Sequence, residues 1–274
     1  MRIGFLGAGK MAEAILAALI RNRVVPAARI MIREVVAARR AHIRRRYGVC
    51  AAATATDLVA ACDVVVLAVK PQDLDELLAH VAPALGKRHV VLSIAAGKTL
   101  AHLQKLAGRR VRLVRVMPNL PVMVGEGMSA FCLGRQARPA DRKLAVRLLG
   151  CCGRVVELDE RQFDAVTALS GSGPAFFTYL LAALADAAVA EGLPADAARL
   201  LAEQTMLGAA RYLLETGIAP DDLIQAVASP KGTTAAGLAV LEASAVRQIL
   251  GRTIQAAARR SHELSVATQA VRSQ

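Results

Sequence analysis

The sequence is short of aromatic residues and of cysteines arranged for bonding. Its 274 residues include no tryptophan, three tyrosines and five phenylalanines, so the stacking surfaces by which proteins bind single-stranded nucleic acid are scarce. The five cysteines are odd in number and lack CxxC spacing, which argues against a disulfide framework or a zinc site. We expect reduced thiols in a cytoplasmic protein.

Targeting and membrane signals are also missing. The first six residues run directly into a glycine-containing turn, unlike a secretory leader. The longest apolar stretch, residues 175–185, is about half as long as the ~20 residues that a membrane span needs. We therefore expect no membrane partner.

Positive charge is abundant and unevenly placed. The formal net charge is +13; residues 1–160 hold 26 Lys and Arg against 12 Asp and Glu, whereas residues 161–274 hold 9 against 10. A basic chain favours nucleic acid or an anionic small molecule as its partner. Because one half carries the whole excess, we expect an anionic ligand of that half and no nucleic acid.

Residues 1–160 alternate between short apolar runs and helical patterns. Alternating βα units predict an α/β fold with a doubly wound parallel sheet. The continuous β-branched run at residues 63–69 is typical of a parallel strand covered on both faces. We expect strands at residues 2–6, 28–32, 63–69, 89–94, 111–116 and 154–158, and helices at 11–20, in the Arg-rich segment up to 46, and at 139–149.

Residues 161–274 read as an all-helical domain. Helix-start signals at Pro174, Pro194 and Pro220 punctuate segments rich in Ala and Leu, and no strand-like run interrupts them. Low charge and Ala-lined faces indicate helices that pack against one another or against another subunit. We therefore expect two domains, 1–160 and 161–274.

A glycine turn follows the first expected strand and opens a helix. Its sequence is Gly7-Ala8-Gly9-Lys10-Met11-Ala12, where the first glycine permits the tight turn and the second lets the backbone approach a pyrophosphate. Exposed N–H groups at the helix start would then hold the phosphates. The alternative is a tight βα turn that binds nothing.

The end of the second strand bears on the choice of dinucleotide. It carries Arg33 and Glu34; an arginine at this place favours the 2′-phosphate of NADPH, and an acidic residue favours the ribose of NADH. We expect NADPH, with NADH as the alternative. The arginines of the next helix are expected to form a solvated face that adds positive potential nearby: Arg39, Arg40, Arg44, Arg45 and Arg46.

Several further motifs occur in a fixed order. They are Ala68-Val69-Lys70-Pro71, Ser93-Ile94-Ala95-Ala96-Gly97, Met117-Pro118-Asn119, Ser170-Gly171-Ser172-Gly173-Pro174-Ala175, Leu214-Glu215-Thr216-Gly217 and Ser229-Pro230-Lys231-Gly232-Thr233-Thr234. In this order the sequence resembles the pyrroline-5-carboxylate reductase family. The resemblance implies an N-terminal Rossmann-type domain followed by an all-helical dimerisation domain.

The resemblance also implies an activity, namely NAD(P)H-dependent reduction of the cyclic imine 1-pyrroline-5-carboxylate to L-proline, the last step of proline biosynthesis. It implies homodimers joined through the helical domains, which can assemble into a larger ring. It implies cofactor contacts at Gly7, Ala8, Gly9, Lys10, Met11, Arg33, Val69, Lys70, Pro71, Ala95, Ala96, Gly97 and Asn119. Substrate contacts are implied at Ser229, Gly232, Thr233 and Thr234, with Thr234 as the catalytic residue.

Simpler interpretations stay open for some of these residues. Lys70 could be a surface lysine before a Pro turn, and Asn119 could merely hydrogen-bond within a turn. The hydroxyls of Ser229, Thr233 and Thr234 could serve only to cap a helix. A cyclic imine needs only a hydride and a proton, so no metal is expected. Four positions depart from the family pattern, and Lys231, in place of glycine, matters most; the others are Ala55, Leu120 and Gln225.

Three other functional classes compete. A β-hydroxyacid-type dehydrogenase would resemble its relatives in carrying a lysine on the first long helix of the second domain, and residues 171–216 hold none. An NADPH-binding paralogue with a regulatory role, or a reductase of a related cyclic imine acid, is the alternative function. A nucleic-acid binder is motivated by charge alone.

Overall fold

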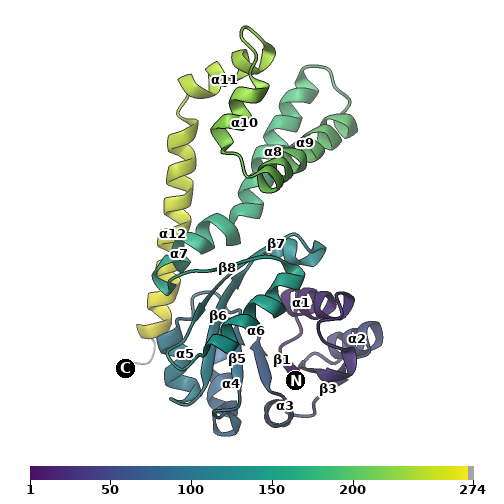
Figure 1. Cartoon of the computed structure of the whole chain (residues 1–274), viewed down its shortest axis with the longest axis vertical. Coiled ribbons are helices and arrows are strands. Elements are labelled where there is room, and N and C mark those ends of the chain that lie inside the picture. The colour runs from purple at the N-terminus through teal and green to yellow at the C-terminus, as the bar shows by residue number, and fades with distance from the viewer. Residues whose placement is uncertain (271–274) are drawn as a thin grey trace. The chain divides into compact units, whose positions relative to one another are not determined.

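Eight strands form one sheet in the order β3-β2-β1-β4-β5-β6-β7-β8 (Figure 1). The computed structural model describes residues 1–270. The strands are β1 (Ile3–Leu6), β2 (Ile30–Arg33), β3 (Cys50–Ala51), β4 (Val64–Leu67), β5 (Val90–Ser93), β6 (Arg112–Pro118), β7 (Gly127–Leu133) and β8 (Gly153–Glu157). β2 and β3 extend the sheet on one side of β1, and the chain then crosses over to place β4 on the other side. β1 and β4 are therefore neighbours at the switch point of the sheet.

The sheet is parallel over six strands and then changes direction. β7 pairs with β6 in the antiparallel sense, with Val114 opposite Leu133 and Pro118 opposite Ser129, and β8 runs parallel to β7. Residues 119–126 between β6 and β7 are too few for the crossover that a parallel strand needs. Neither β7 nor β3 was expected from the sequence. The predicted doubly wound parallel sheet is confirmed, as a sheet dominated by parallel strands to which β7 adds one antiparallel pairing.

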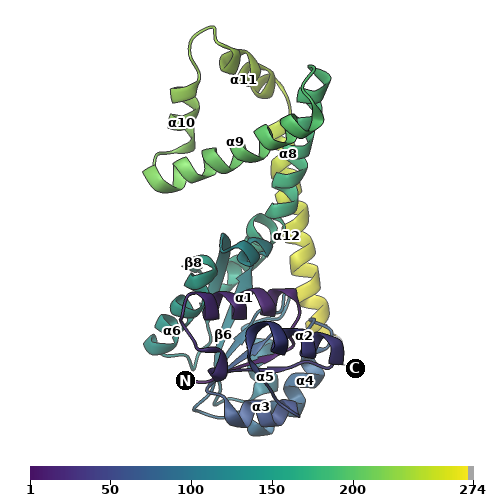
Figure 2. The same ribbon diagram turned by 90° about the vertical axis from the view of Figure 1, so that its right-hand side faces the viewer.

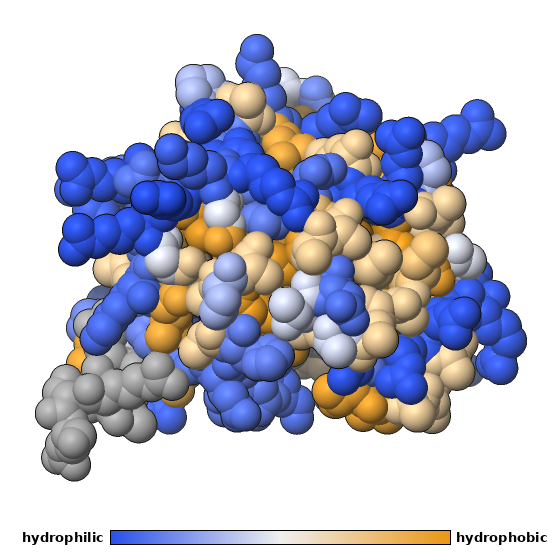
Figure 3. Space-filling model, turned by 90° about the horizontal axis from the view of Figure 1, so that it is seen from below, coloured by the Kyte–Doolittle hydropathy of each residue, from blue (hydrophilic) through white to orange (hydrophobic). Residues whose placement is uncertain are grey.

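Helices cover both faces of this sheet, as the doubly wound prediction requires. One apolar core lies under α1 (Lys10–Arg21), α2 (Ala37–Tyr47) and α6 (Pro139–Leu149), and contains Phe5, Leu16 and Ile43. A second core lies under α3 (Ala55–Ala61), α4 (Leu74–Val81) and α5 (Leu100–Ala107), and it contains Leu58 and Leu78. Alternate strand residues point to opposite cores, which explains why the buried strands are apolar on both sides. Figure 3 shows hydrophilic side chains around the edge of one face of the molecule, with smaller apolar patches between them.

The chain divides into two compact units. One comprises Met1–Ser172 together with the chain from Ala257 onward, and the other is Gly173–Ala256. The short α7 (Phe163–Val166) and a π-helical turn over Thr167–Gly171 end the first stretch of the first unit. The long α12 (Val246–Ala270) contributes residues to both units. Its buried Ser261 donates a hydrogen bond to Asp164 at 2.7 Å, across 97 residues of sequence.

The second unit is built only of helices among its residues, as expected. They are α8 (Gly173–Ala190), α9 (Ala195–Thr216), α10 (Pro220–Val227), α11 (Thr233–Ala243) and the start of α12. Gly217 ends α9 in the left-handed conformation at φ 71°. Pro220 begins α10 at the first helical position, where a backbone N–H would have no acceptor within the helix. α8 and α9 pack against each other (Figure 2). α10 and α11 have no fully buried residue.

One helical stretch is apolar enough to cross a membrane by length and composition. It spans Glu160–Ala190, and only 11% of its most apolar window is buried within the chain. The expectation that the run is too short considered only residues 175–185, whereas the helical stretch is longer. Helices that bury an apolar face against a second subunit have the same composition.

Candidate functional site

A pocket lies at the carboxyl ends of β1, β2 and β4, beside the switch point of the sheet. Its volume is ≈ 430 Å³. Open α/β sheets bind their ligands at this place. The pocket is lined by Leu6, Gly7, Gly9, Arg33, Glu34, Val35, Val36, Ala68, Val69, Lys70, Gln72, Asp73 and Leu77.

The glycine turn forms one wall of this pocket. Gly7 has φ +92°, and a Cβ there would lie 2.7 Å from the Ala68 carbonyl oxygen, so only glycine fits. Gly9 precedes α1, and a Cβ there would meet nothing within 4 Å. Lys10 and Met11 begin α1, whose first N–H groups have no intrahelical acceptor. The start of α1, together with Gly9, therefore presents open space and free N–H donors to an anion.

Ala8, at the centre of the turn, is held by side chains from the β2–α2 segment. Its N–H donates to the Glu34 carboxylate at 2.9 Å, and its carbonyl accepts from Arg39 Nε at 2.8 Å. The second oxygen of Glu34 accepts from the Val36 N–H at 2.9 Å. The two peptide groups on either side of Ala8 are thus fixed by charged side chains remote in sequence.

Glu13, in the first turn of α1, joins α1 to α2. Its carboxylate accepts from Arg39 at 2.5 Å and from the Tyr47 hydroxyl at 2.9 Å, with His42 at 3.5 Å. Burial alone would raise the pKa of Glu13, but the hydrogen bonds from Tyr47 and Arg39 outweigh it, and the pKa lies below its usual value. The ion pair keeps Arg39 in place against Ala8.

Two other arginines meet at one oxygen atom. Arg33 donates to the Glu34 backbone carbonyl at 2.9 Å, and Arg40 donates to the same oxygen at 2.8 Å. The solvated face predicted for α2 therefore does not include Arg39 and Arg40, because each bonds a backbone carbonyl beside the pocket and is half-buried. Arg44, Arg45 and Arg46 are exposed.

The loops after β4 and β5 carry further predicted cofactor contacts. Val69 and Lys70 line the pocket, and Lys70 and Pro71 are exposed. Ala95, Ala96 and Gly97 follow β5, outside that lining, and Gly97 has φ +72°.

The residue after Gly97 anchors the β5 loop. Lys98 is buried, and its ammonium lies 2.8 Å from Asp75, which also bonds His102 at 2.9 Å. Burial would raise the pKa of Asp75, but the hydrogen bonds from Lys98 and His102 lower it below its usual value. This buried cluster fixes the end of the β5 loop to α4 and α5.

Asn119 follows β6, and its side chain is engaged within the protein. Its carbonyl oxygen accepts from the Met128 N–H at 2.8 Å, and its amide donates to the Ser170 hydroxyl at 3.4 Å. These bonds join β6, β7 and the π-helical turn.

The predicted substrate residues lie in the second unit, where α11 begins. Ser229, Pro230, Lys231 and Gly232 form a turn in which the Gly232 N–H donates to the Ser229 carbonyl at 3.0 Å. Lys231 has φ +61°, and proline followed by a left-handed residue is the pattern of a type II turn, which prefers glycine there.

The start of α11 has no side-chain cap. Gly232 is its N-cap residue, and no side chain accepts from the first N–H groups. Thr233 is exposed, and Thr234 is half-buried. Because the nearby hydroxyls do not cap the helix, both they and the N–H groups are free to meet a carboxylate.

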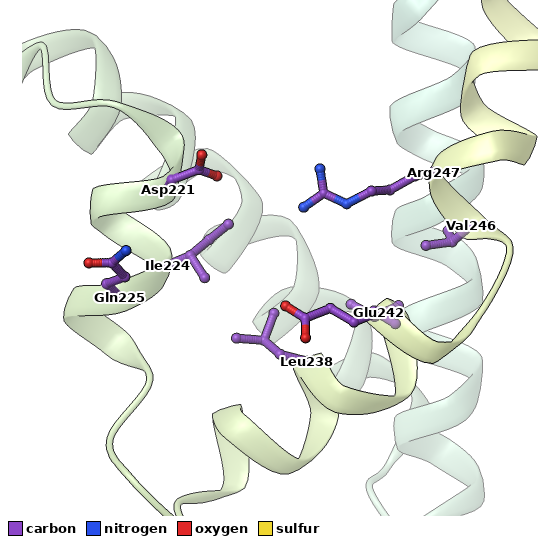
Figure 4. A pocket seen from close by; sticks show the side chains of 8 residues that line it. Asp221, Ile224, Gln225, Leu238, Glu242, Val246 and Arg247 are labelled. Carbon is purple, nitrogen blue, oxygen red and sulfur yellow. The ribbon is translucent and has the colours of Figure 1, made fainter.

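A second hollow of ≈ 410 Å³ lies between α10, α11 and the start of α12. Arg247 extends into it toward Asp221 and Glu242, while Ile224 and Leu238 supply apolar walls (Figure 4). In the described part of the chain no group of three or more His, Cys, Asp or Glu could hold a metal ion. All five cysteines are free thiols.

Sequence reasoning missed the roles of Arg39 and Arg40. Both belong to an Arg-rich helix, where spacing alone does not separate a buried guanidinium from a solvated one. Glu13 was the available signal, because it lies in the first turn of the helix that follows the glycine turn. An acidic residue there needs a cationic partner if the start of that helix is to bind an anion.

Comparison with known proteins agrees with these features. Residues 160–264 match the family described as pyrroline-5-carboxylate reductase dimerisation, and residues 2–97 match the family described as NADP oxidoreductase coenzyme F420-dependent. The chain is 42% identical to the pyrroline-5-carboxylate reductase of Glycine max, with 96% of each chain covered. It is 40% identical to that of Synechocystis, with 96% of this chain and 98% of the relative covered.

Solved structures give the same result. The pyrroline-5-carboxylate reductase of Coxiella burnetii has a TM-score of 0.92 at 35% identity, with 96% of this chain and 98% of that chain covered. The Plasmodium falciparum pyrroline carboxylate reductase, with NADP bound, has a TM-score of 0.85 at 26% identity, with 97% and 98% covered. With such similarity over nearly its whole length, the chain belongs to the pyrroline-5-carboxylate reductase family.

Proposed function

We propose that this protein reduces 1-pyrroline-5-carboxylate to L-proline, with NADPH as the reductant. Family membership over the whole chain carries the proposal, and the pocket at the sheet's switch point supports it. NADH is the alternative reductant, because Glu34 stands beside Arg33 at the end of β2.

The residues of the first unit fit a dinucleotide. Gly9 leaves open space where a Cβ would stand. The first N–H groups of α1 have no intrahelical acceptor and are available to bind an anion. Gly7, Ala8, Gly9, Lys10 and Met11 would hold the diphosphate. Arg33 would bind the 2′-phosphate, Val69, Lys70 and Pro71 the ribose region, and Ala95, Ala96, Gly97 and Asn119 the nicotinamide end.

The chemistry asks little of the protein beyond orientation and one proton. When bound, the nicotinamide supplies a hydride to the imine carbon. The first turn of α11 would bind the substrate carboxylate through N–H groups and the hydroxyls of Ser229 and Thr233, next to Gly232. The Thr234 hydroxyl would donate a hydrogen bond to the imine nitrogen and help deliver the proton that this nitrogen takes up as the hydride reaches the carbon, and solvent would replace that proton on the hydroxyl.

We further propose a homodimer joined through the helical domain, with residues 1–160 binding the cofactor and 161–274 binding substrate and partner. Within one chain, Phe177, Tyr179 and Leu200 are 54%, 77% and 65% exposed. Such a surface needs a covering partner, and the hollow of Figure 4, at ≈ 410 Å³, has room for side chains of a second copy. A larger ring and a cytoplasmic location complete the proposal, and the free thiols fit that compartment.

One assay tests the function. Purified protein is mixed with NADPH or NADH and either pyrroline-5-carboxylate or its six-membered piperideine analogue, and loss of reduced cofactor and appearance of the cyclic amino acid are measured. We expect turnover of the five-membered substrate, fastest with NADPH. Turnover of only the six-membered analogue would assign a related imine acid, and cofactor binding without turnover would assign a regulatory paralogue.

A further inference from the structure

Arg40, to which no role in binding has been given so far, lies beside Arg33 near the glycine turn. Their guanidinium groups donate to one oxygen, the Glu34 carbonyl, at 2.9 and 2.8 Å. The two donor nitrogens therefore lie within about 6 Å of each other. Like charges this close repel unless an anion compensates them.

No carboxylate compensates this pair within the described residues. The only carboxylate in the segment, that of Glu34, is bonded to the N–H groups of Ala8 and Val36, each at 2.9 Å. Neither guanidinium has an ion-pair partner within 4.0 Å there. Arg39 differs, because Glu13 pairs with it. The chain thus balances the charge of Arg39 and leaves that of Arg33 and Arg40 unbalanced.

The loop beside the two arginines also presents apolar surface. Val35 and Val36 line the pocket and are 79% and 57% exposed. Exposed apolar side chains beside unpaired guanidinium groups suit a ligand with a flat apolar part and a phosphate, which describes an adenosine that carries a 2′-phosphate.

We infer that Arg40, together with Arg33, binds the 2′-phosphate, and that Glu34 braces the glycine turn through Ala8 rather than binding the ribose. Two guanidinium forks match the oxygens of one phosphate. The inference rests on the proposed use of NADPH and adds to it a second 2′-phosphate ligand.

The test compares two nucleotides without substrate. Calorimetry measures the Kd of 2′,5′-ADP and of 5′-AMP, which differ only in the 2′-phosphate, for wild type, Arg40→Met and Arg33→Met. Arg45→Met is the matched control, because Arg45 is exposed on the same helix. Thermal unfolding verifies that each variant is folded.

We expect each of Arg40→Met and Arg33→Met to weaken 2′,5′-ADP by about 10- to 100-fold and 5′-AMP by less than about 3-fold. Arg45→Met should change neither by more than about 3-fold. Arg40→Lys, which keeps the charge and loses the fork, should fall between wild type and Arg40→Met.

Two results overturn the inference. One is an Arg40→Met protein that is folded and still prefers 2′,5′-ADP as wild type does. The other is a wild type that binds both nucleotides equally, which removes the 2′-phosphate site but leaves a reductase that uses NADH. Failure of the proposed function is distinct, because then no turnover of the imine occurs with either cofactor, whatever the Arg40 variants bind.

Discussion

The Glu34 carboxylate accepts a hydrogen bond from the backbone N–H of Ala8 at 2.9 Å, across 26 residues of sequence. The segment after β2 therefore holds the turn after β1. A dinucleotide contacts both segments in this fold, so a substitution at Glu34 acts on the diphosphate site and on the 2′ position together.

Glu34→Gln should favour NADPH. The amide keeps an acceptor for the Ala8 N–H but removes a negative charge beside Arg33 and Arg40, so the ratio of kcat/KM for NADPH to that for NADH should rise by about 10-fold. Steady-state kinetics with both cofactors measures it. Glu191→Gln, at an exposed position of the second unit, is the control; an unchanged ratio in Glu34→Gln would contradict the charge argument.

The two glycines of the turn should respond differently to alanine. Gly7→Ala adds a Cβ 2.7 Å from the Ala68 carbonyl oxygen at φ +92°, and should lower the free energy of unfolding by about 2 kcal/mol or more. Gly9→Ala meets no protein atom within 4 Å, so it should leave the Tm nearly unchanged and weaken NADPH binding. Thermal unfolding and nucleotide titration separate them, and equal Tm losses would refute the distinction.

Lys231→Gly should stabilise the protein. Lysine at φ +61° costs about 1–2 kcal/mol relative to glycine, and the greater freedom of glycine in the unfolded chain returns part of this. A net gain of about 0.5–1 kcal/mol, or ~2 °C in Tm, is expected. Lys231→Ala, which keeps the strain, should show no gain.

Thr234→Ala should lower kcat by about 100-fold, because its hydroxyl would help deliver the proton to the ring nitrogen. Thr234→Ser keeps a hydroxyl on the same residue and should restore most of the activity. The KM for NADPH serves as an internal control, because it should not move. An alanine variant with wild-type kcat and KM would remove Thr234 from catalysis.

Glu13→Gln should destabilise the protein only where the wild-type carboxyl is ionised. The folded-state pKa of Glu13 is depressed, so its stabilisation is complete above the pKa of an unfolded glutamate, about 4.3, and is lost as the pH falls through the lower folded-state value. The Tm difference from wild type should be largest near neutral pH and vanish in acid. Arg39, His42, Arg46 and Tyr47 are the charged or titratable groups around it. A constant difference would point to shape rather than charge.

Residues whose role is local were predictable from the sequence. The β-branched run at 63–69 predicted a strand, and β4 lies within it. The fixed spacing of the glycine turn predicted a helix start, and α1 begins there. Lys231 was recognised as a departure from glycine, and its φ of +61° gives the physical content of that departure.

Residues whose role is tertiary were not predictable. β7 was missed because Gly127 begins it and its direction depends on pairing with β6. Arg39 was assigned to solvent because its partners, Ala8 and Glu13, are brought to it only by the packing of α1 beside α2. Arg40 was assigned to solvent because its bond to the Glu34 carbonyl depends on how the segment between β2 and α2 folds back.

The two units are interleaved along the chain, because the first is completed only by residues from Ala257 onward. On the ribosome, the sheet can form while the helical unit is still being made, but Asp164 must wait for Ser261. Synthesis of the first unit therefore finishes last. A premature stop shortly before Ala257 would harm the N-terminal unit as well as the C-terminal one.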